Sequence, residues 1–206
     1  MSKYHKINTI FKRSPETNKI IEGDFSSPEF EYLANNMWSW SEKVDGTNIR
    51  VMIQGGNVTF GGRTDLAQIP AQLMSRLNER FLPLAKRMED MFSCDAILFG
   101  EGYGAKIQKV GKNYREDQDF VLFDVKVGTY WLKREDVEDV ANKFGIDVVP
   151  IIGEGTLHDA IEAVRSGIVS TWGDFKAEGI VARPKTELNT RDGRRIITKI
   201  KYRDFL

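Results

Sequence analysis

Residues 37–60 read MWSWSEKVDGTNIRVMIQGGNVTF, and this stretch indicates the class of fold. Residues 37–41 have the character of a strand, and the Asp-Gly pair at 45–46 predicts a turn after it. The β-branched runs 49–54 and 58–60 flank Gly-Gly-Asn, which is typical of a β-hairpin. The stretch therefore predicts antiparallel strands and places Lys43 at a strand end, beside a turn.

The rest of the chain adds strands and helices in separate groups. Strands are predicted over 96–99, 120–127, 129–132, 179–183 and 195–202. Apolar residues three and four apart predict helices over 71–91, broken at Pro83, over 134–144, ending at Gly145, and over 157–164, capped by Thr156. Because strands and helices do not alternate strictly, we expect an α+β fold of antiparallel sheets flanked by helices. No repeat or Pro-rich linker divides the sequence, so a single domain over residues 1–206 is predicted.

Composition limits the class of protein. Hydrophobic residues make up 41% of the chain and charged residues 29%, as in ordinary globular proteins. The apolar runs, such as 148–152, are far too short for a membrane span, and the charged N-terminus does not resemble a secretory signal. One cysteine, Cys94, and two histidines disfavour disulfides and the common zinc sites. We therefore expect a cytoplasmic protein with no membrane partner.

Charge is balanced over the whole chain but not along it. The 30 basic and 30 acidic residues cancel, which argues against a general nucleic-acid binder. Residues 183–206, however, contain eight basic and three acidic residues. This excess predicts a local phosphate-facing surface at the C-terminal end, with a solvated charged face as the alternative.

Lys43 is the first candidate for chemistry. It lies in Glu42-Lys43-Val44-Asp45-Gly46-Thr47-Asn48. One interpretation is a surface lysine beside a hairpin turn; the other is a nucleophile presented at that turn. A lysine amine is almost wholly protonated at neutral pH, so an attack on phosphorus requires neighbouring cations or a metal ion that favour loss of the proton.

Four further segments carry candidate residues. They are Phe99-Gly100-Glu101-Gly102, a strand that runs into a glycine-rich loop; Asp119–Asp124, with its aromatic residues; Glu178-Gly179-Ile180-Val181; and Lys199-Ile200-Lys201. The two lysines of the last segment fall on one face of a strand, where both can contact one phosphate group. Taken singly, each segment also has an ordinary structural interpretation as turn, core or solvated surface.

Together and in this order, the five segments resemble the motifs of the covalent nucleotidyltransferases, which comprise polynucleotide ligases and mRNA capping enzymes. The resemblance extends from Trp38 to Asp204 and is closest to the ATP-dependent RNA ligases of the bacteriophage type. Residues 3–7 are also similar to the start of such ligases. The resemblance implies the ATP-grasp-like adenylation domain of DNA and RNA ligases, in a bacterial or phage-infected cytosol.

The resemblance also implies roles for individual residues. Lys43 would attack the α-phosphate of ATP, form lysyl-AMP and release pyrophosphate. The other roles are adenine contact for Glu42, adenine stacking for Phe123, ribose binding for Glu101, nucleotide or 5′-phosphate binding for Arg63, α-phosphate binding for Lys199 and Lys201, and a divalent metal, Mg²⁺ or Mn²⁺, for Glu178. The surrounding cations would disfavour the protonated form of Lys43.

Two features of the sequence refine this expectation. Asn48 belongs to the nucleotide-binding motif, and it stands where most DNA ligases and capping enzymes have arginine, whereas RNA ligases typically have asparagine. The chain ends soon after Lys201, so no appended OB or helical domain is expected, and end joining is expected to be weaker than adenylylation or to depend on a partner.

The expected substrate is RNA or a nicked duplex with 5′-phosphate and 3′-hydroxyl ends, and a monomer is expected, with assistance by a partner protein left open. The alternatives are a DNA nick ligase, a capping-type guanylyltransferase, a self-adenylylating subunit of a larger complex, and a purely structural domain.

Overall fold

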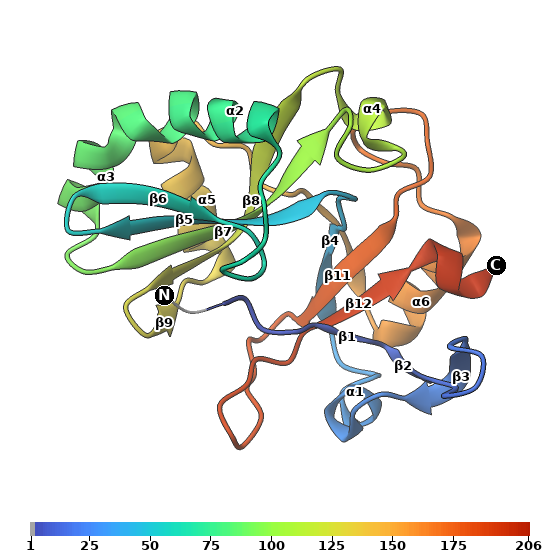
Figure 1. The fold of residues 1–206 in the computed structure, drawn as a ribbon. Helices are drawn as coiled ribbons and strands as arrows, with labels where there is room; N and C mark the ends of the chain where they lie inside the picture. Colours follow the sequence, from blue (N-terminus) through green and yellow to red (C-terminus); the bar gives the residue numbers. More distant parts are fainter. Residues whose placement is uncertain (1–2) are drawn as a thin grey trace. The chain divides into compact units, whose positions relative to one another are not determined.

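The computed structural model describes residues 3–206, which pack into two compact units (Figure 1). Unit 1 contains Asp45–Val149 with Lys3 and Tyr4, and unit 2 contains His5–Val44 and Pro150–Leu206. Each unit combines a five-stranded, mainly antiparallel sheet with helices, which confirms the predicted α+β class. The assignment of residues 1–206 to one functional domain stays a prediction.

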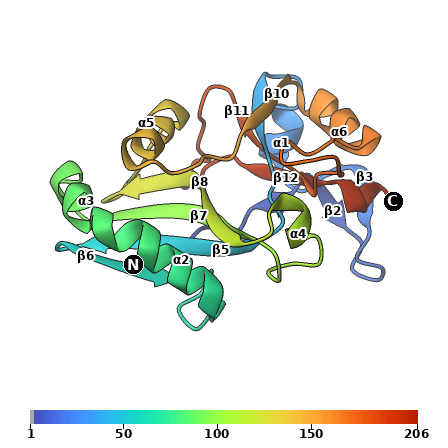
Figure 2. The same ribbon diagram turned by 90° about the horizontal axis from the view of Figure 1, so that it is seen from above.

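Unit 1 is an antiparallel sheet with helices packed on one face (Figures 1 and 2). Its strand order is β6-β5-β7-β8-β9. The strands are β5 (Thr47–Gln54), β6 (Asn57–Gly61), β7 (Ala96–Gly104), β8 (Gln118–Val127) and β9 (Tyr130–Trp131), and the helices are α2 (Ala71–Phe81), α3 (Ala85–Met91), α4 (Gly111–Tyr114) and α5 (Arg134–Phe144). A single apolar core joins α2, α3 and α5 to the sheet. The predicted break at Pro83 is confirmed, because a 3₁₀ turn over Leu82–Leu84 separates α2 from α3.

Strand β7 corrects one prediction. The sequence indicated a strand ending near Phe99 and then a glycine-rich loop, but β7 continues to Gly104. A Cβ atom on Gly100 would lie 2.3 Å from the ring of Phe120, and one on Gly102 would lie 2.4 Å from Leu73 Cδ2. These glycines therefore admit side chains of β8 and α2 against the strand, which is a packing role that the sequence alone did not distinguish from a turn.

Unit 2 is built on a second sheet, with strand order β1-β12-β11-β4-β10. Its strands are β1 (Asn8–Thr9), β4 (Trp38–Glu42), β10 (Ile151–Gly155), β11 (Gly179–Pro184) and β12 (Thr198–Lys201); β2 (Phe11–Arg13) and β3 (Ile20–Phe25) form a separate pair, and the helical segments are α1 (Pro28–Tyr32), α6 (Leu157–Ser166) and η2 (Tyr202–Phe205). Only the β1–β12 pairing is parallel within this sheet. Apolar side chains of α6 pack against Trp38, Ile180 and Ile200 on one face of the sheet.

Several elements of unit 2 differ from the sequence predictions. The strand expected over 195–202 is shorter, because only Thr198–Lys201 pair continuously with β11, and Arg195 makes an isolated bridge to Asn189. The first three strands, α1 and β10 were not predicted, since most are too short to show a hydrophobic period. Among residues 3–206, no helix is long and apolar enough to cross a membrane.

Asp119 on β8 is expected to stabilise unit 1 through three arginines. Its buried carboxylate pairs with Arg80 at 2.5 Å, Arg115 at 2.8 Å and Arg76 at 3.2 Å. Asp119→Asn removes the one buried counter-charge that these three cations share, and because they retain some solvent access and exposed partners we expect a loss of about 2–3 kcal/mol in the free energy of unfolding, measured by urea denaturation. Asp117→Asn removes an exposed partner of Arg115 and is the control, with an expected loss below about 1 kcal/mol. Equal losses in both variants would contradict this role.

The same contacts determine how the stability of unit 1 depends on pH. Burial raises the pKa of Asp119 most strongly, but the hydrogen bonds from Arg76 and the Phe120 backbone N–H, together with the charge of Arg80 and its hydrogen bond, outweigh burial, so the pKa lies below its usual value. The stabilisation is therefore complete above the unfolded pKa of about 3.9 and is lost as the pH falls through the lower folded pKa. Asp119→Asn should accordingly flatten the decline of stability in acid.

Candidate active site

Lys43 lies directly after β4, at the end of the sheet in unit 2 where β4, β11 and β12 are neighbours. Its backbone N–H donates to the Gly179 carbonyl oxygen at 2.9 Å, and Gly179 of β11 pairs with Lys201 of β12. The strand pairing therefore places Lys43 and Lys201 on either side of Gly179, although they are far apart along the chain. Glu178, the residue before β11, precedes Gly179 directly.

Glu178 bridges the two lysines. Its Oε2 atom lies 2.5 Å from Lys43 Nζ, and its Oε1 atom lies 2.6 Å from Lys201 Nζ. Burial is the largest effect on the pKa of Glu178 and raises it, but the charges of Lys43 and Lys201 and the hydrogen bonds from both lysines together outweigh burial. The pKa is held below its usual value, so the carboxylate is ionised at neutral pH. We call Lys43, Glu178 and Lys201 the lysine–glutamate cluster.

Lys199 shares the face of β12 that carries Lys201. Along β12, Thr198 and Ile200 are buried whereas Lys199 and Lys201 are partly exposed. Ile200 belongs to the apolar core, so both lysines point away from that core. The prediction that the two lysines lie on one strand face is thus confirmed, and their binding of the α-phosphate stays a prediction.

Glu42, next to Lys43, is held inside unit 2. Its side chain is 1% exposed, and it accepts hydrogen bonds from Ser170 Oγ at 2.6 Å and from both the backbone N–H and Oγ1 of Thr171 at 2.8 Å. Ser170 and Thr171 are missing from the sequence predictions, and no motif marks them. The predicted contact of Glu42 with adenine stays a prediction, and the observed role of its carboxylate is to fix this loop.

Three predicted nucleotide-binding residues gather on the helix-free face of the sheet in unit 1. Asn48 on β5 lies opposite Glu101 on β7, and their strand neighbours Ile49 and Leu98 point to the core on the other face. A bulge in β8 between the pairs Phe99–Asp124 and Gly100–Leu122 accommodates Phe123 as the extra residue. Asn48 Oδ1 is buried and has no hydrogen-bond partner within residues 3–206, so it can accept a hydrogen bond from a ligand.

Tyr4 supports this face, although the sequence predicts no site role for it. Its ring packs edge-on against Phe123, with centroids 5.1 Å apart, and its hydroxyl donates to Asp124 at 2.7 Å. Its ring also lies 5.1 Å from that of Phe99. The N-terminal Lys3-Tyr4 sequence is the signal that could have identified this supporting role.

Arg63 lies exposed in the loop after β6, and its predicted phosphate contact stays a prediction. The loop itself is held by Arg50, whose side chain is 1% exposed. Arg50 Nε donates to the Gly62 carbonyl oxygen and its guanidinium pairs with Asp65, both at 2.8 Å. Arg50 was not predicted as a site residue, although a charged residue inside an apolar strand run was a usable signal.

Close packing against β7 leaves no room for a side chain at Gly46, in the segment Glu42–Asn48. A Cβ atom at this position would lie 2.2 Å from the Gly102 carbonyl oxygen and 2.8 Å from Glu101 Cγ. Gly46→Ala must therefore displace β7 beside Glu101, and we expect a loss of about 1–3 kcal/mol in the free energy of unfolding with a reduced rate of adenylylation. Gly193→Ala, at an exposed loop position with open space around it but a φ of +80°, adds backbone strain without a clash, and it should cost about 1 kcal/mol in the free energy of unfolding and leave adenylylation unchanged. Stability and adenylylation equal to the wild type would show that Gly46 is replaceable.

The metal prediction involves one carboxylate of the cluster. Within residues 3–206 there is no group of three or more His, Cys, Asp or Glu residues arranged to hold a metal ion. Mg²⁺ is commonly bound by one or two carboxylates together with substrate phosphates and water. The single, ionised carboxylate of Glu178 next to a lysine nucleophile candidate fits such a site.

Comparison with known proteins identifies the family. A family model of RNA ligases matches residues 36–201, which include every predicted site residue from Glu42 to Lys201. The chain therefore belongs to the RNA ligase family.

The fold is similar to that of solved RNA ligases from Naegleria gruberi. The structure of that ligase with PPi has a TM-score of 0.70 and 18% sequence identity over 98% of this chain. A mutant of the same ligase with ATP and Mn has a TM-score of 0.70 and 16% identity, also over 98% of this chain. In both cases the match covers 56% of the Naegleria chain, so the present chain spans just over half its length.

Proposed function

We propose that this chain is an ATP-dependent RNA ligase that uses Lys43 as the covalent nucleophile. The observation that carries the proposal is the lysine–glutamate cluster, in which one partly buried carboxylate holds Lys43 and Lys201 at 2.5 and 2.6 Å. Two cations around one anion are the arrangement expected where a phosphate group is to be bound and attacked. Membership of the RNA ligase family and the ATP and Mn in the Naegleria structures support the same assignment.

In the proposed first step, the unprotonated Lys43 amine attacks the α-phosphorus of ATP. A nitrogen–phosphorus bond forms, the bond from the α-phosphorus to the bridging oxygen breaks, and pyrophosphate leaves. Lys199 and Lys201 would neutralise the α-phosphate, while Asn48, Glu101 and Phe123 would bind the adenosine. Glu178 would hold Mg²⁺ or Mn²⁺, which when bound supplies charge neutralisation at the phosphates.

In the two later steps, AMP passes from Lys43 to a 5′-phosphate end, and a 3′-hydroxyl then displaces AMP to join the strands. The substrate in this proposal is RNA or a nicked duplex that carries these ends. Action as a monomer and a cytoplasmic location are part of the proposal.

The test is intact-protein mass spectrometry after incubation with ATP and Mg²⁺, followed by addition of a nicked duplex with an RNA 3′-hydroxyl. An AMP adduct that disappears as sealed strand accumulates is the expected result. An adduct that persists with RNA, DNA and mixed nicks would limit the chain to self-adenylylation, and the absence of any adduct would contradict the proposal.

A further inference from the structure

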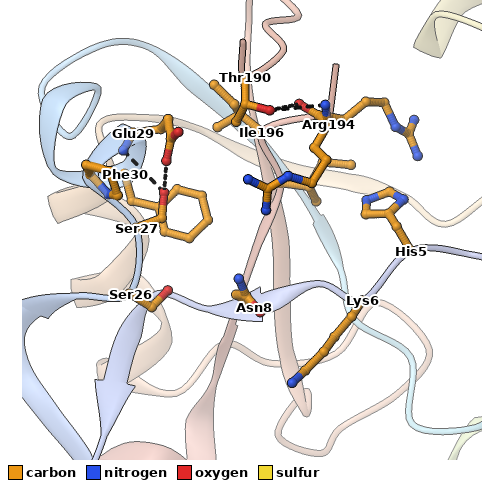
Figure 3. Close-up of a pocket in the computed structure, with 13 residues that line it drawn as sticks. His5, Lys6, Asn8, Ser26, Ser27, Glu29, Phe30, Thr190, Arg194 and Ile196 are labelled. Atoms are coloured by element: carbon orange, nitrogen blue, oxygen red, sulfur yellow. Dashed lines mark hydrogen bonds between the residues drawn. The ribbon is translucent and has the colours of Figure 1, made fainter. Parts of the chain in front are cut away.

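Unit 2 contains a pocket that the proposed adenylyl transfer does not use (Figure 3). It has a volume of about 590 Å³, within the usual range of ligand sites. Three segments meet around it, namely the start of the chain with His5 and Asn8, the residues before α1, and the loop that leads into β12. None of the residues in the five motifs lines this pocket, although His5 and Lys6 belong to residues 3–7, which are similar to the start of such ligases.

The lining of the pocket is basic. Lys6, Arg194 and Arg195 contribute three cationic side chains, against one carboxylate from Glu29. That carboxylate already accepts a hydrogen bond from the Ser27 hydroxyl. Arg194 pairs with Asp192 at 2.7 Å, but both side chains are exposed, so solvent screens the pair and an anion can replace it at low cost. The pocket therefore offers an excess of positive charge to a ligand.

The pocket also has an apolar floor. Phe30, Ile196 and Ile197 are buried beneath it, at 4%, 7% and 5% exposure. An exposed amide side chain, that of Asn8, lies at its rim. Cations around an apolar floor suit a ligand that is anionic on one side and carries a sugar or base on the other, as a nucleotide of a nucleic-acid strand does.

The position of the pocket along β12 indicates a long ligand. Its wall ends at Ile197, directly before β12, and Lys199 and Lys201 follow within that strand. With a rise of about 3.3 Å per residue, Lys201 lies about 13 Å along the strand from Ile197. A nucleic-acid strand covers that span with about four nucleotides at ~3.4 Å each. The basic excess of residues 183–206 thus extends from the lysine–glutamate cluster to the pocket.

We propose that this pocket is a binding subsite for the polynucleotide backbone, which holds a phosphate a few nucleotides away from the end that reacts. The identity of the ligand as a polynucleotide rests on the proposed function, whereas the site itself rests on the pocket and its charges. The subsite gives the C-terminal basic excess a specific role.

The test measures binding of a fluorescent single-stranded RNA of about ten nucleotides by anisotropy over a range of salt concentrations. The double variant Lys6→Glu/Arg194→Glu is expected to bind about tenfold more weakly than the wild type. Loss of one or two phosphate contacts should also lower the slope of log K against log salt by about 0.7 for each contact. The control Lys19→Glu/Lys133→Glu makes the same change of charge at exposed positions outside both the lining and residues 183–206, and it should stay within about twofold of the wild type.

Two further measurements separate the outcomes. Adenylylation of Lys43 should be unchanged in the Lys6→Glu/Arg194→Glu variant, which also shows that the variant is folded. Equal losses of RNA affinity in the pocket and control variants would overturn the subsite. So would complete displacement of the RNA by inorganic phosphate, added at the same concentration of phosphate groups as the RNA contains. If the wild type binds RNA through the pocket but never becomes adenylylated, the proposed function fails and the binding site stands.

Discussion

A Lys43→Ala chain incubated with ATP and Mg²⁺ should show no AMP adduct by intact-protein mass spectrometry. The substitution removes the only nitrogen that the proposal allows to attack the α-phosphorus, so the expected effect is complete loss. The partner that holds this nitrogen is Glu178, at 2.5 Å. ATP should still raise the melting temperature of the variant, because binding needs the nucleotide-contacting residues and not the covalent step.

Lys43→Arg separates charge from nucleophilicity. A guanidinium keeps the positive charge and can pair with Glu178, but it stays protonated at any accessible pH and is not a nucleophile. We therefore expect Lys43→Arg to be folded and as free of adduct as Lys43→Ala. Lys112→Ala, which removes an exposed lysine on α4, should be adenylylated like the wild type. A covalent AMP on either Lys43 variant would mean that another residue is the nucleophile.

The site was predictable where its signals are local. Lys43, Asn48 and the paired lysines Lys199 and Lys201 stand in short motifs whose residue types are recognisable without the fold. Helix boundaries were predictable for the same reason, since α5 shows a clear apolar period and ends at Gly145. The arrangement of β4, β11 and β12 then brings Glu178 to Lys43 across 135 positions of sequence.

What the sequence did not show depends on contacts between distant residues. Ser170 and Thr171 acquire their role only because the fold brings them to Glu42, 128 and 129 positions away. Gly100 looked like part of a loop because its packing partner, Phe120, belongs to another strand. Strand β1 has two residues and is a strand only through its pairing with β12. Local pattern cannot supply such partners, so these features had to come from the structure.

Glu178→Gln is expected to lower the rate of adenylylation by about 1,000-fold, measured as AMP adduct formed over time. The amide keeps the shape of the side chain but removes the charge that holds Lys43 and Lys201 and that would bind the metal. Several kcal/mol of transition-state stabilisation depend on such a charge, and each 1.36 kcal/mol corresponds to a tenfold change in rate. Glu178→Asp keeps the charge on a shorter side chain and should lose less. Glu187→Gln, at an exposed position, should leave the rate unchanged.

The dependence on Mg²⁺ distinguishes the two roles of this carboxylate. If Glu178 holds the metal, Glu178→Gln should raise the Mg²⁺ concentration needed for half-maximal adenylylation by about tenfold or more. If the carboxylate only orients Lys43, the rate falls while the Mg²⁺ requirement stays the same, and the metal assignment is then wrong. Because the lowered pKa of Glu178 keeps its carboxylate ionised at neutral pH, the wild-type carboxylate is available to the metal, and protonation restricts it only in acid, as the pH falls through that pKa.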